Sequence, residues 1–464
     1  MSDLQHPPIK TIAVILAGGR GLRFGGEVPK QFVKLAGRMV IEYTVEVFEQ
    51  CDAVDHIIIV VPAGYQDTLW EVTMRNDWRK VMKIVEGGRD RADSTASALA
   101  ALTEFSADAK VLTHDAARPL LDQPTLARFL SALDEYAAVD VVIPASDTIV
   151  EVNDRQQIAD IPDRSRLRRG QTPQGFHLGV LREAYQRVIA RGFVGVTCDC
   201  GVVRREMPEV AIGTVLGDAA NIKITDSIDL FFAEKLLQLR TTQAVQDEST
   251  LSQLEGKVVV VIGASSGIGA AVANLAQRYG ARVYGASRTL DGLDITQQNQ
   301  VHDLLATVAA QEGKIDAVIN TAALLIKKPL THLSAVEIGQ VIATNLTAAI
   351  TLSQEAYPWL RATQGCLINF ASSSYTRGRA FYAVYSATKA AIVNMTQALA
   401  EEWAAEHVRV LCINPERTMT PMRMRNFGAE PPETLLDPET VARATLQAMC
   451  SSLTGAVFDV RRKN

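Results

Sequence analysis

The sequence predicts the α/β fold class, with two domains that each enclose a mostly parallel sheet. Three observations predict it. The chain has 464 residues, more than one hydrophobic core normally serves. Apolar β-branched runs alternate with helix-spaced apolar patterns in both halves, as in proteins built from βα units. Glycine-rich loops at 17–21 and 263–269 each follow an apolar run directly, so each half carries one candidate phosphate-binding turn.

The first half is predicted to contain five strands and three helices before a closing helix. The strands are expected at 11–16, 56–61, 81–85, 110–113 and 139–144. The helices are expected at 39–50, 93–105 and 123–136, with an amphipathic helix at 226–239. A polar stretch without a clear strand pattern follows. We therefore expect a first domain over 1–239 and a linker over 240–255.

A second βα series begins at residue 257 and predicts a second domain over 256–464. Its strands are expected at 258–262, 282–286, 317–320, 366–370 and 409–413, with helices between them. This regular alternation is typical of a doubly wound sheet.

Composition narrows the class of partner and the compartment. The formal net charge of −5 argues against nucleic-acid and membrane-surface binding, because both partners are anionic. No run of eighteen apolar residues occurs, so no transmembrane helix is expected, and the first ten residues lack the apolar stretch of a secretory signal. Six cysteines spread over the chain do not make a disulfide framework. We expect a cytoplasmic protein with reduced thiols.

The first glycine loop belongs to a larger set of motifs. Small residues at 17–19 let backbone N–H groups approach a triphosphate closely, and Arg20 and Lys30 add cationic donors. Further motifs follow at 86–94, 114–119, 163–164, 172–174 and 221–225. In this order and spacing, residues 9–236 resemble the cytidylyltransferases of polyol phosphates, which include methylerythritol-phosphate and ribitol-phosphate enzymes. The resemblance implies a nucleotidyltransferase Rossmann-like α/β fold.

This resemblance also implies the residues that bind substrates. For CTP they are Ala17, Gly18, Gly19, Arg20 and Lys30 at the triphosphate, Gly88 and Ser94 at the cytosine, and Asp115 at the nucleotide and Mg²⁺. For the acceptor they are Arg164 and Thr197 at the polyol phosphate, with Lys223 near the reacting phosphates. The reaction brings one anion onto another, so positioning and charge neutralisation carry the catalysis. Arg20, Lys30 and Lys223 are the expected catalytic cations.

The first half departs from the family pattern near the acceptor and the metal. Ala220 stands where an acidic residue is common, so Asp218 is an alternative ligand, and Cys198 replaces an acidic residue while Asp199 is retained. These changes concern the identity of the acceptor more than the use of CTP. Of the arginines at 164–169, at least two are expected on a solvated face. His114 is expected to pack beneath Asp115 rather than to bind a metal.

The second glycine loop also has matching partners along the chain. The spacing Gly-x-x-x-Gly-x-Gly at 263–269 lies between an expected strand and helix, where a pyrophosphate can meet the helix N-terminus. Tyr385, Lys389, Ser372 and Asn345 join it, together with the run 320–323. This set resembles the short-chain dehydrogenase/reductase family across 256–464, and implies a doubly wound Rossmann reductase fold.

Reductase chemistry explains the spacing of Tyr385 and Lys389. Four residues apart on a helix, they share one face. We expect the Lys389 ammonium to lower the pKa of the Tyr385 phenol, which donates the proton in reduction, while Ser372 orients the substrate carbonyl. By resemblance, Lys389 also holds the nicotinamide ribose and Asn345 anchors a proton-relay water.

The expected cofactor is NADPH. By resemblance its site comprises Gly263, Ser266, Gly267, Ile268, Gly269, Ser287, Arg288, Asp294, Asn320, Tyr385 and Lys389. An enzyme that uses NAD has an acidic residue after the second strand, to bind the ribose 2′-hydroxyl. Here Ser287 and Arg288 stand there, which suits a 2′-phosphate. Asp294 is expected at the adenine.

The second half departs from its family in two segments. The run Asn-Thr-Ala-Ala at 320–323 lacks the second Asn and the Gly of the family motif, and Glu416 replaces a usual Gly beside the nicotinamide. Residues 417–436 are short for a substrate lid and include Arg417, Arg423 and Arg425. These arginines either face solvent, or one or two of them bind a substrate phosphate.

The two halves together suggest consecutive reactions. The whole chain resembles the bifunctional ribulose-5-phosphate reductase/CDP-ribitol pyrophosphorylases that feed bacterial capsule and related polymers. That resemblance implies NADPH-dependent reduction of D-ribulose 5-phosphate to D-ribitol 5-phosphate, then transfer from CTP. Two alternatives stay open: a methylerythritol-phosphate cytidylyltransferase fused to an unrelated reductase, and an inactive second domain that serves as a dimerisation scaffold. A homodimer or higher homo-oligomer is expected.

Overall fold

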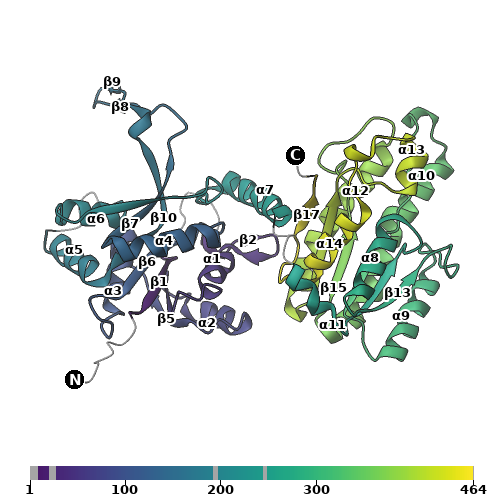
Figure 1. Ribbon diagram of the computed structural model, residues 1–464, viewed down its shortest axis with the longest axis horizontal. Coiled ribbons are helices and arrows are strands. Elements are labelled where there is room, and N and C mark those ends of the chain that lie inside the picture. Colours follow the sequence, from purple (N-terminus) through teal and green to yellow (C-terminus); the bar gives the residue numbers. More distant parts are fainter. Residues whose placement is uncertain (1–8, 20–27, 192–196, 244–247, 463–464) are drawn as a thin grey trace. The chain divides into compact units, whose positions relative to one another are not determined.

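The computed structural model describes residues 9–19, 28–191, 197–243 and 248–462 (Figure 1). The chain divides into two compact units, Met1–Leu236 and Leu237–Asn464. Each unit is an α/β body around one main sheet, as the alternating apolar patterns predict.

The first unit is built on a seven-stranded sheet in the order β11-β7-β10-β6-β1-β4-β5. Its strands are β1 (Thr11–Leu16), β4 (His56–Val61), β5 (Val81–Glu86), β6 (Lys110–Asp115), β7 (Ala138–Pro144), β10 (Arg168–His177) and β11 (Ile212–Leu216). β10 is antiparallel to β6 and β7, and the other neighbours are parallel. Leu16 lies opposite Asp115 in register, so the segments after β1 and β6 begin at the same edge.

Helices cover both faces of this sheet. They are α1 (Val40–Glu49), α2 (Gln66–Arg75), α3 (Arg91–Ala100), α4 (Gln123–Glu135), α5 (Leu178–Arg191) and α6 (Asp199–Glu206), and α7 (Ser227–Gln243) follows the last strand. Ala13 and Ile15 join the core that includes α1 and α4, whereas Ile12 and Val14 join the core that includes α3 and α5. Successive strand residues point to opposite faces, so β1 needs apolar residues throughout. Complete burial of Ile15 contributes roughly 2 kcal/mol.

A small hairpin extends from the body of the first unit (Figure 1). It consists of β8 (Glu151–Val152) and β9 (Ile158–Asp160), and the segment from Ala145 to Leu167 that contains it is largely exposed. Apolar patterns predict neither this hairpin nor β10 and β11. Strands of two or three residues are too short for an alternation to show, and β10 is polar over most of its length. A second small pair, β2 (Lys34–Leu35) and β3 (Arg38–Met39), precedes α1.

The second unit contains a six-stranded parallel sheet in the order β13-β12-β14-β15-β16-β17. Its strands are β12 (Val258–Ile262), β13 (Arg282–Ala286), β14 (Ala317–Asn320), β15 (Cys366–Phe370), β16 (Arg409–Pro415) and β17 (Val457–Val460). Its helices are α8 (Gly267–Arg278), α9 (Gln298–Glu312), α10 (Ala335–Ile342), α11 (Ala348–Thr363), α12 (Ala383–Glu402), α13 (Pro421–Phe427) and α14 (Pro438–Cys450). The strand order reverses direction between β12 and β14, which is where doubly wound sheets bind ligands.

The segment expected to be a linker is partly structured. The division between the units falls inside α7, and residues 248–254 form the 3-10 helix η4 (Glu248–Leu254). Leu251 and Leu254 are completely buried in the core of the second unit, beside α8 and α14. Leu251 and Leu254 follow the polar run three positions apart, so both side chains are buried on one side of η4. The second unit therefore begins several residues before 256.

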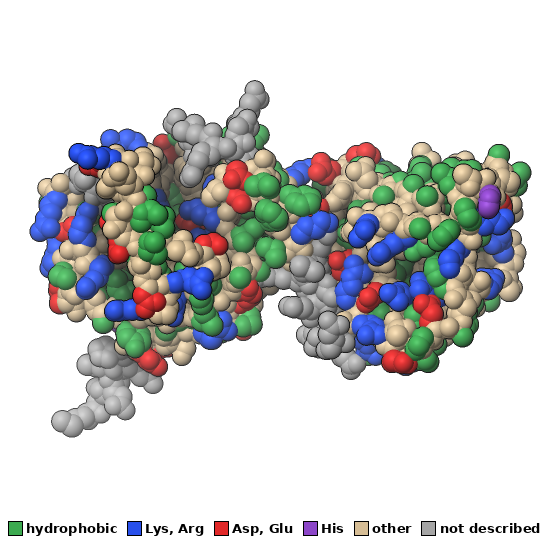
Figure 2. Space-filling model, turned by 90° about the horizontal axis from the view of Figure 1, so that it is seen from above, with side chains coloured by type: hydrophobic (Ala, Val, Ile, Leu, Met, Phe, Trp, Pro, Cys, Tyr) green, Lys and Arg blue, Asp and Glu red, His purple; other side chains and the backbone are tan. Residues whose placement is uncertain are grey.

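Helix length, cysteines and surface charge complete the description. Among the described residues, one helical run, Ala335–Thr363, is long and apolar enough to cross a membrane by length and composition alone. Core helices of soluble proteins pass the same test, and Leu352 and Leu360 of this run are completely buried in the core of the second unit. All six cysteines are free thiols, as expected. Figure 2 shows Lys and Arg interspersed with Asp and Glu over the face in view.

Candidate active sites

The glycine turn after β1 packs tightly against the segment before α3. A Cβ atom on Gly18 would lie 2.7 Å from Ser94 Oγ and 3.5 Å from Gly87 Cα, so the close approach needs a glycine. The backbone N–H of Ala17 donates to the carbonyl of Val60 at 2.7 Å. The structure thus brings together Ala17, Gly18 and Ser94, as predicted. Arg20 lies outside the described residues.

Asp115, at the end of β6, is surrounded by three cations. Its Oδ2 lies 2.9 Å from Lys223 Nζ and 3.5 Å from Arg118 Nε, and its Oδ1 lies 3.5 Å from Arg91 Nε. Burial opposes ionisation of this carboxyl, but the three positive charges outweigh it and hold its pKa well below the usual range. Asp115 is therefore an anion within a net positive cluster, and that excess charge suits a triphosphate.

Lys30 reaches the same edge of the sheet from η2 (Lys30–Phe32). Its Nζ donates to the carbonyl of Ile224 at 2.6 Å, next to Lys223. The neighbouring Gln31 donates through Nε2 to the carbonyls of Ala17 and Gly19 and so fixes the glycine turn. The structure thus gathers Lys30, Lys223 and the turn, as expected. Gln31 was not predicted, although it stands beside Lys30 in the motif.

Arg91 and Arg118 are site residues that the sequence analysis missed. Arg91 starts α3, and its Nη1 lies 2.8 Å from Asp199 Oδ2. Arg118 donates through Nη1 to the carbonyl of Asn221 at 2.8 Å, which ties the end of β6 to the segment that carries Lys223. Both arginines lie inside quoted motifs, at 86–94 and 114–119. That position was the available signal.

Asp199 is the anchor of a buried hydrogen-bond network. Its side chain is completely buried, and its carboxylate accepts from Tyr185 at 2.5 Å, Thr113 at 2.6 Å and Thr95 at 3.1 Å. Together with Arg91 these contacts satisfy the charge inside the protein. Asp199 therefore faces inward and orients Arg91 beside Asp115, rather than facing an acceptor sugar. Its burial could not be read from the motif alone.

Thr197 and Arg164 lie apart from this cluster in their contacts. Thr197 is exposed, and the next residue, Cys198, begins α6, where its Sγ accepts from Gly201 N at 3.3 Å. Arg164 lies in η3 (Arg164–Arg166) and donates to the carbonyl of Ser146 at 3.0 Å. Within the described ranges Arg164 forms no ion pair. Its expected role at the acceptor phosphate stays a prediction.

His114 precedes Asp115 in β6, is completely buried and packs edge-on against Phe48 of α1. Burial lowers the pKa of its imidazole to about 4, so it is neutral at neutral pH. Its Nε2 lies 3.3 Å from the carbonyl of Arg118, and its Nδ1 lies 3.0 Å from Thr172 Oγ1. A carbonyl can only accept, so Nε2 carries the proton and Nδ1 accepts from the hydroxyl. Thr172 Oγ1 in turn accepts from Asp115 N at 3.1 Å, which fixes the backbone of the acid.

Two further expectations for the first site concern Gly88 and a metal. A Cβ on Gly88 would lie 2.1 Å from Asp93 Cβ, so this position too requires glycine. Within the described part of the chain, no group of three or more His, Cys, Asp or Glu side chains could hold a metal ion. Asp115 is thus a single carboxylate, and Mg²⁺ is usually held by one or two carboxylates plus substrate phosphates. Residue Asp218 accepts from Ala220 N at 2.7 Å.

The second glycine loop lies between β12 and α8, and two of its glycines are sterically required. Gly263 has φ +85°, and a Cβ there would lie 2.7 Å from Thr321 Oγ1. A Cβ on Gly269 would lie 2.3 Å from the carbonyl oxygen of Gly263. Gly267 opens α8, so the helix N-terminus follows the turn directly.

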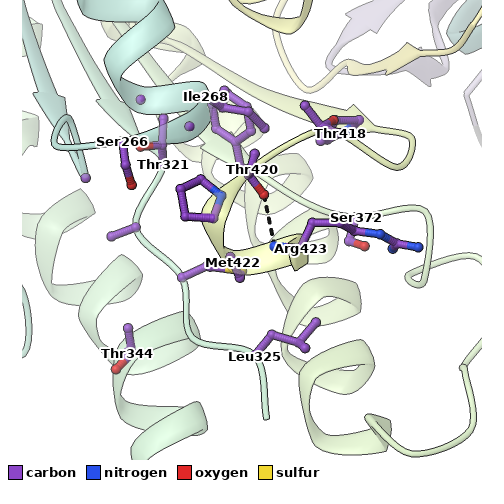
Figure 3. A pocket seen from close by; sticks show the side chains of 18 of the residues that line it. Ser266, Ile268, Thr321, Leu325, Thr344, Ser372, Thr418, Thr420, Met422 and Arg423 are labelled. Atoms are coloured by element: carbon purple, nitrogen blue, oxygen red, sulfur yellow. Dashed lines mark hydrogen bonds between the residues drawn. The ribbon is translucent and has the colours of Figure 1, made fainter. Parts of the chain in front are cut away.

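This loop borders a cavity of about 540 Å³ in the second unit (Figure 3). Eleven of the residues predicted for this site line the cavity: Gly263, Ser266, Gly267, Ile268, Gly269, Ser287, Arg288, Asp294, Ser372, Tyr385 and Lys389. Asn320 and Asn345 are buried and are not part of its lining. The cavity lies beside β12 and β14, the neighbouring strands between which the strand order reverses. Its volume is in the range of small-molecule sites.

Ser372, Tyr385 and Lys389, the expected catalytic residues, line the same cavity. Ser372 is hydrogen-bonded to Tyr385, whose pKa is raised to about 12 by burial. Burial lowers the pKa of Lys389 to about 8. Lys389 Nζ donates to the carbonyl of Phe370 at 2.7 Å and lies 5.7 Å from the centroid of the Tyr385 ring. The expected lowering of the tyrosine pKa by Lys389 is therefore not found. Ser372 and the charge of Arg423 oppose the effect of burial instead.

Asn345 connects two segments beside the cavity through hydrogen bonds of its side-chain amide. It lies in the π-helical turn η6 (Ala343–Thr347) between α10 and α11. Its amide accepts from Leu324 N at 2.7 Å, donates to the Leu324 carbonyl at 2.8 Å and lies 3.3 Å from Thr388 Oγ1. A π turn often marks a functional position. Here it directs Asn345 toward the segment after β14. The water that Asn345 is expected to hold stays a prediction.

The residues expected to select the cofactor follow the end of β13. Arg288 is exposed and lines the cavity, and Ser287 Oγ accepts from Leu290 N at 3.1 Å. An unpredicted acid, Asp291, accepts from Ser287 N at 2.9 Å and so closes the turn. Asp294 accepts from Thr296 N at 3.0 Å and Thr296 Oγ1 at 2.8 Å, and these bonds lower its pKa.

Both halves of the chain match known enzyme families. Residues 11–239 match the family model of 2-C-methyl-D-erythritol 4-phosphate cytidylyltransferase. Residues 257–430 match the family model of short chain dehydrogenases. These matches occur in the order that the motifs predict, and the second begins at the residue where the second βα series was expected.

Three curated relatives are similar to this chain. It is 44% identical over 459 residues to a bifunctional ribulose 5-phosphate reductase/CDP-ribitol pyrophosphorylase of Haemophilus influenzae, with 98% of this chain and 96% of the relative covered. It is 40% identical to a 2-C-methyl-D-erythritol 4-phosphate cytidylyltransferase of Thermobifida fusca, over 51% of this chain and 97% of the relative. It is 34% identical to a ribitol-5-phosphate cytidylyltransferase of Lactiplantibacillus plantarum, over 49% of this chain and 99% of the relative.

Proposed function

The chain belongs to the family of bifunctional ribulose 5-phosphate reductase/CDP-ribitol pyrophosphorylases, and on that premise we propose that it makes CDP-ribitol in two steps. Its second unit reduces D-ribulose 5-phosphate to D-ribitol 5-phosphate with NADPH. Its first unit transfers a cytidylyl group from CTP to that product and releases pyrophosphate. The observation that carries the proposal is the 44% identity over 98% of the chain, which spans both units. The family match also confirms the two-domain α/β fold class and the bifunctional enzyme class.

In the cytidylyl transfer, a phosphate oxygen of ribitol 5-phosphate attacks the α-phosphorus of CTP. The bond from that phosphorus to the bridging oxygen breaks, and pyrophosphate leaves. The Ala17–Gly19 turn and Lys30 hold the triphosphate, and Lys223 neutralises the charge that develops around the α-phosphorus. Support comes from the pairing of Lys223 with Asp115 at 2.9 Å and of Lys30 with the adjacent carbonyl at 2.6 Å. Arg20 is assigned to the triphosphate by its motif alone.

Magnesium is the proposed metal, with Asp115 as its protein ligand. When bound, Mg²⁺ supplies charge neutralisation and orientation of the triphosphate oxygens. Asp115 suits this role because its Oδ1 has its nearest cation, Arg91, at 3.5 Å, while Oδ2 carries the closer contact with Lys223. Oδ1 of Asp115 would therefore be the oxygen that holds the metal. Gly88 and Ser94 are assigned to the cytosine, and Arg164 and Thr197 to the acceptor phosphate.

In the reduction, Tyr385 donates its phenolic proton to the carbonyl oxygen of the ketose as a hydride reaches the carbonyl carbon. NADPH supplies that hydride when bound. Ser372 donates a hydrogen bond to the same carbonyl oxygen and keeps the substrate beside the phenol. Lys389 contributes a buried positive charge near the ribose of the cofactor and the phenol. The burial of Tyr385 supports its role as an acid, because it holds the proton at neutral pH.

Selection of NADPH over NADH is assigned to Arg288. Its exposed guanidinium lines the cavity after β13, where a 2′-phosphate would accept a bidentate pair. The acid in this turn, Asp291, is engaged with Ser287 N, and its carboxylate closes the loop. Gly263, Gly267 and Gly269 let the backbone approach the pyrophosphate, with Ser266 and Ile268 between them. Asp294 is assigned to the adenine.

The alternative is a methylerythritol-phosphate cytidylyltransferase with an inactive second unit. The 40% identity of the first half to such an enzyme favours it. Against it, Ser372, Tyr385 and Lys389 converge on one cavity with the complete glycine loop. A scaffold would have no need of this arrangement. We further propose a homo-oligomer in the cytoplasm that acts on small molecules rather than on nucleic acid or membranes.

The test follows NADPH oxidation at 340 nm with D-ribulose 5-phosphate, and pyrophosphate release with D-ribitol 5-phosphate, CTP and Mg²⁺. The proposal predicts both activities, and no pyrophosphate above background with 2-C-methyl-D-erythritol 4-phosphate. Pyrophosphate release with the methylerythritol substrate, without NADPH oxidation by the ketose phosphate, would favour the alternative.

A further inference from the structure

Two cations share one aromatic ring at the substrate end of the reductase cavity. The ring is that of Phe427, at the end of α13, a short helix whose residues border the cavity (Figure 3). The guanidinium carbon of Arg423 lies 3.9 Å from the ring centroid, and the Nζ of Lys327 lies 4.5 Å from it. Lys327 is exposed and lies in the segment after β14, beside the residues that line the cavity rather than among them. Two segments far apart in sequence thus bring positive charge to the same place.

Aromatic contacts connect this pair to the proton donor. Phe427 packs edge-on against Tyr382 with centroids 5.8 Å apart, and Tyr382 packs edge-on against Tyr385 at 6.2 Å. The charge of Arg423 also reaches the phenol of Tyr385, where it opposes the rise in pKa that burial causes. In Figure 3 the side chain of Arg423 extends from α13 near Ser372. The Tyr382 ring thus stands between Tyr385 and Phe427, so a substrate whose carbonyl meets Tyr385 can extend its phosphate end toward the two cations.

The carboxylate of Glu430 accepts two hydrogen bonds from the guanidinium of Arg423. Arg423 Nε lies 2.6 Å from Glu430 Oε2, and Arg423 Nη2 lies 2.8 Å from Glu430 Oε1. Both side chains are about one-fifth exposed, at 20% and 19%. Arg417 and Lys327 are also near enough to lower the pKa of Glu430. Three cations around one carboxylate leave a positive excess, and such an excess attracts an anion of charge −2.

The geometry points to a phosphate subsite: we propose that Arg423 and Lys327 bind the phosphate of the ketose phosphate, and that this phosphate displaces Glu430 from the guanidinium. The inference rests on the proposed reductase function and assigns the residues that recognise its substrate class. A phosphate presents the same pair of oxygens to the fork as a carboxylate does, with one more negative charge. Phe427 holds both cations in place while the anions exchange.

Glu430 therefore competes with the substrate for Arg423, and this competition selects for substrates that carry a negative charge. An unphosphorylated ketose carries no anionic group that could bind Arg423, so the Arg423–Glu430 pair stays intact. A ketose phosphate forms the bidentate contact with Arg423, but part of its binding free energy is used to displace Glu430. Of the two lid arginines that lie on α13, Arg423 is four residues from Phe427 and shares its helix face, whereas Arg425 is two residues away and does not. This spacing assigns the phosphate to Arg423.

Two substitutions on the pair test the subsite through KM in the NADPH assay, with D-ribulose 5-phosphate and unphosphorylated D-ribulose as substrates. Arg423→Gln is expected to raise KM for the phosphate at least thirtyfold and to change kcat/KM for D-ribulose less than threefold. Glu430→Gln is expected to lower KM for the phosphate several-fold and to leave D-ribulose unchanged. Lys327→Met is expected to raise KM for the phosphate by three- to tenfold. The matched control is Arg443→Gln, which removes an arginine of similar exposure from a Glu439 pair on α14.

The subsite is wrong if Arg423→Gln affects both substrates equally, or if Glu430→Gln raises KM for the phosphate. Retained kcat/KM for D-ribulose shows that the second unit of each variant is folded, and retained cytidylyl transfer shows the same for the first unit. Calorimetric titration of D-ribulose 5-phosphate into the NADP⁺-loaded enzyme gives a readout without turnover. Wild-type affinity that Arg423→Gln abolishes supports the subsite even if no NADPH is oxidised, and the proposed reduction alone would then fail. Equal affinity of wild type and Arg423→Gln overturns the subsite.

Discussion

The ammonium of Lys223 lies 2.9 Å from the carboxylate of Asp115, although 108 positions separate them in the chain. The segment before α7 carries Lys223 to the end of β6, where Arg118 also binds the carbonyl of Asn221. The pairing keeps a flexible lysine beside the position proposed for the triphosphate. It also explains why the pKa of Asp115 stays low despite burial, because Lys223 is the strongest of the charges that stabilise the anion.

Replacing Lys223 tests the first site. Lys223→Met should lower kcat for pyrophosphate release by about 10²-fold or more, because it removes a preorganised positive charge from the reacting phosphates. NADPH oxidation by the same protein should stay unchanged. The matched control is Lys10→Met, since Lys10 pairs with Asp55 at 2.7 Å and is 43% exposed, against 39% for Lys223. If both variants lose activity equally, the assignment of Lys223 fails.

The pH dependence of the reductase should report Lys389. Burial lowers the pKa of this lysine to about 8 and raises that of Tyr385 to about 12. Below pH 8 the ammonium is charged and the phenol protonated, so kcat/KM for D-ribulose 5-phosphate should be flat. Above pH 8 the ammonium loses its proton, and kcat/KM should fall toward tenfold per pH unit. A profile that stays level to pH 10 would show that the charge of Lys389 is not required.

Cofactor choice should depend on Arg288. Arg288→Ala should raise KM for NADPH about tenfold, equivalent to about 1.4 kcal/mol, and leave KM for NADH within twofold. The reason is that only NADPH carries the 2′-phosphate that the guanidinium can bind. Arg282→Ala is the control, since Arg282 lies on β13, pairs with Glu312 at 2.6 Å and is not part of the cavity lining. An equal rise for both cofactors would contradict selection by Arg288.

The second glycine loop should not tolerate a single methyl group. In Gly269→Ala the new Cβ would lie 2.3 Å from a backbone oxygen and 2.4 Å from Thr321 Oγ1, so the turn must open. We expect loss of the NADPH fluorescence change on binding, with cytidylyl transfer retained. Gly339→Ala, in α10 with open space around the new methyl, should bind NADPH normally. Normal binding by Gly269→Ala would exclude this turn as the pyrophosphate site.

The buried anchor Asp199 should contribute strongly to the stability of the first unit. Asp199→Asn removes the charge that Arg91 meets at 2.8 Å inside the fold, and breaking such a buried pair costs roughly 3–5 kcal/mol. The control is Asp134→Asn, whose partner Lys110 is at 2.5 Å but whose own side chain is 69% exposed, so a loss under about 1 kcal/mol is expected. Thermal unfolding, with the transition of the first unit identified by its shift on adding CTP, measures both. Equal losses would contradict the anchor role.

The sequence revealed those features whose pattern is local. β1 and β6 were predicted because each is a buried apolar run, and the glycine loops because their steric needs leave only glycine. The chemistry of Tyr385 and Lys389 followed from a spacing of four on one helix. The hairpin β8–β9 and most of β10 were missed, because polar residues on short or exposed strands leave no alternation to read.

Relationships between distant residues were beyond sequence reasoning. Nothing in the motif at 197–199 indicates that Asp199 turns inward to Tyr185 and Arg91, since that depends on the packing of α5 and α6. The pKa of Tyr385 was predicted with the wrong dominant cause, because the distance to Lys389 and the extent of burial are tertiary properties. Arg423 was considered as a phosphate ligand, but its pair with Glu430 became visible only in the fold.

Mass spectrometry of the nucleotide formed from D-ribulose 5-phosphate, CTP, Mg²⁺ and NADPH deuterated at both C4 positions tests the central claim most directly. The account predicts a CDP-pentitol that carries one deuterium, absent when Tyr385→Phe or Lys223→Met replaces the wild-type chain. A cytidylylated ketose without deuterium, or a nucleotide product from Tyr385→Phe equal to that of the wild type, would contradict it.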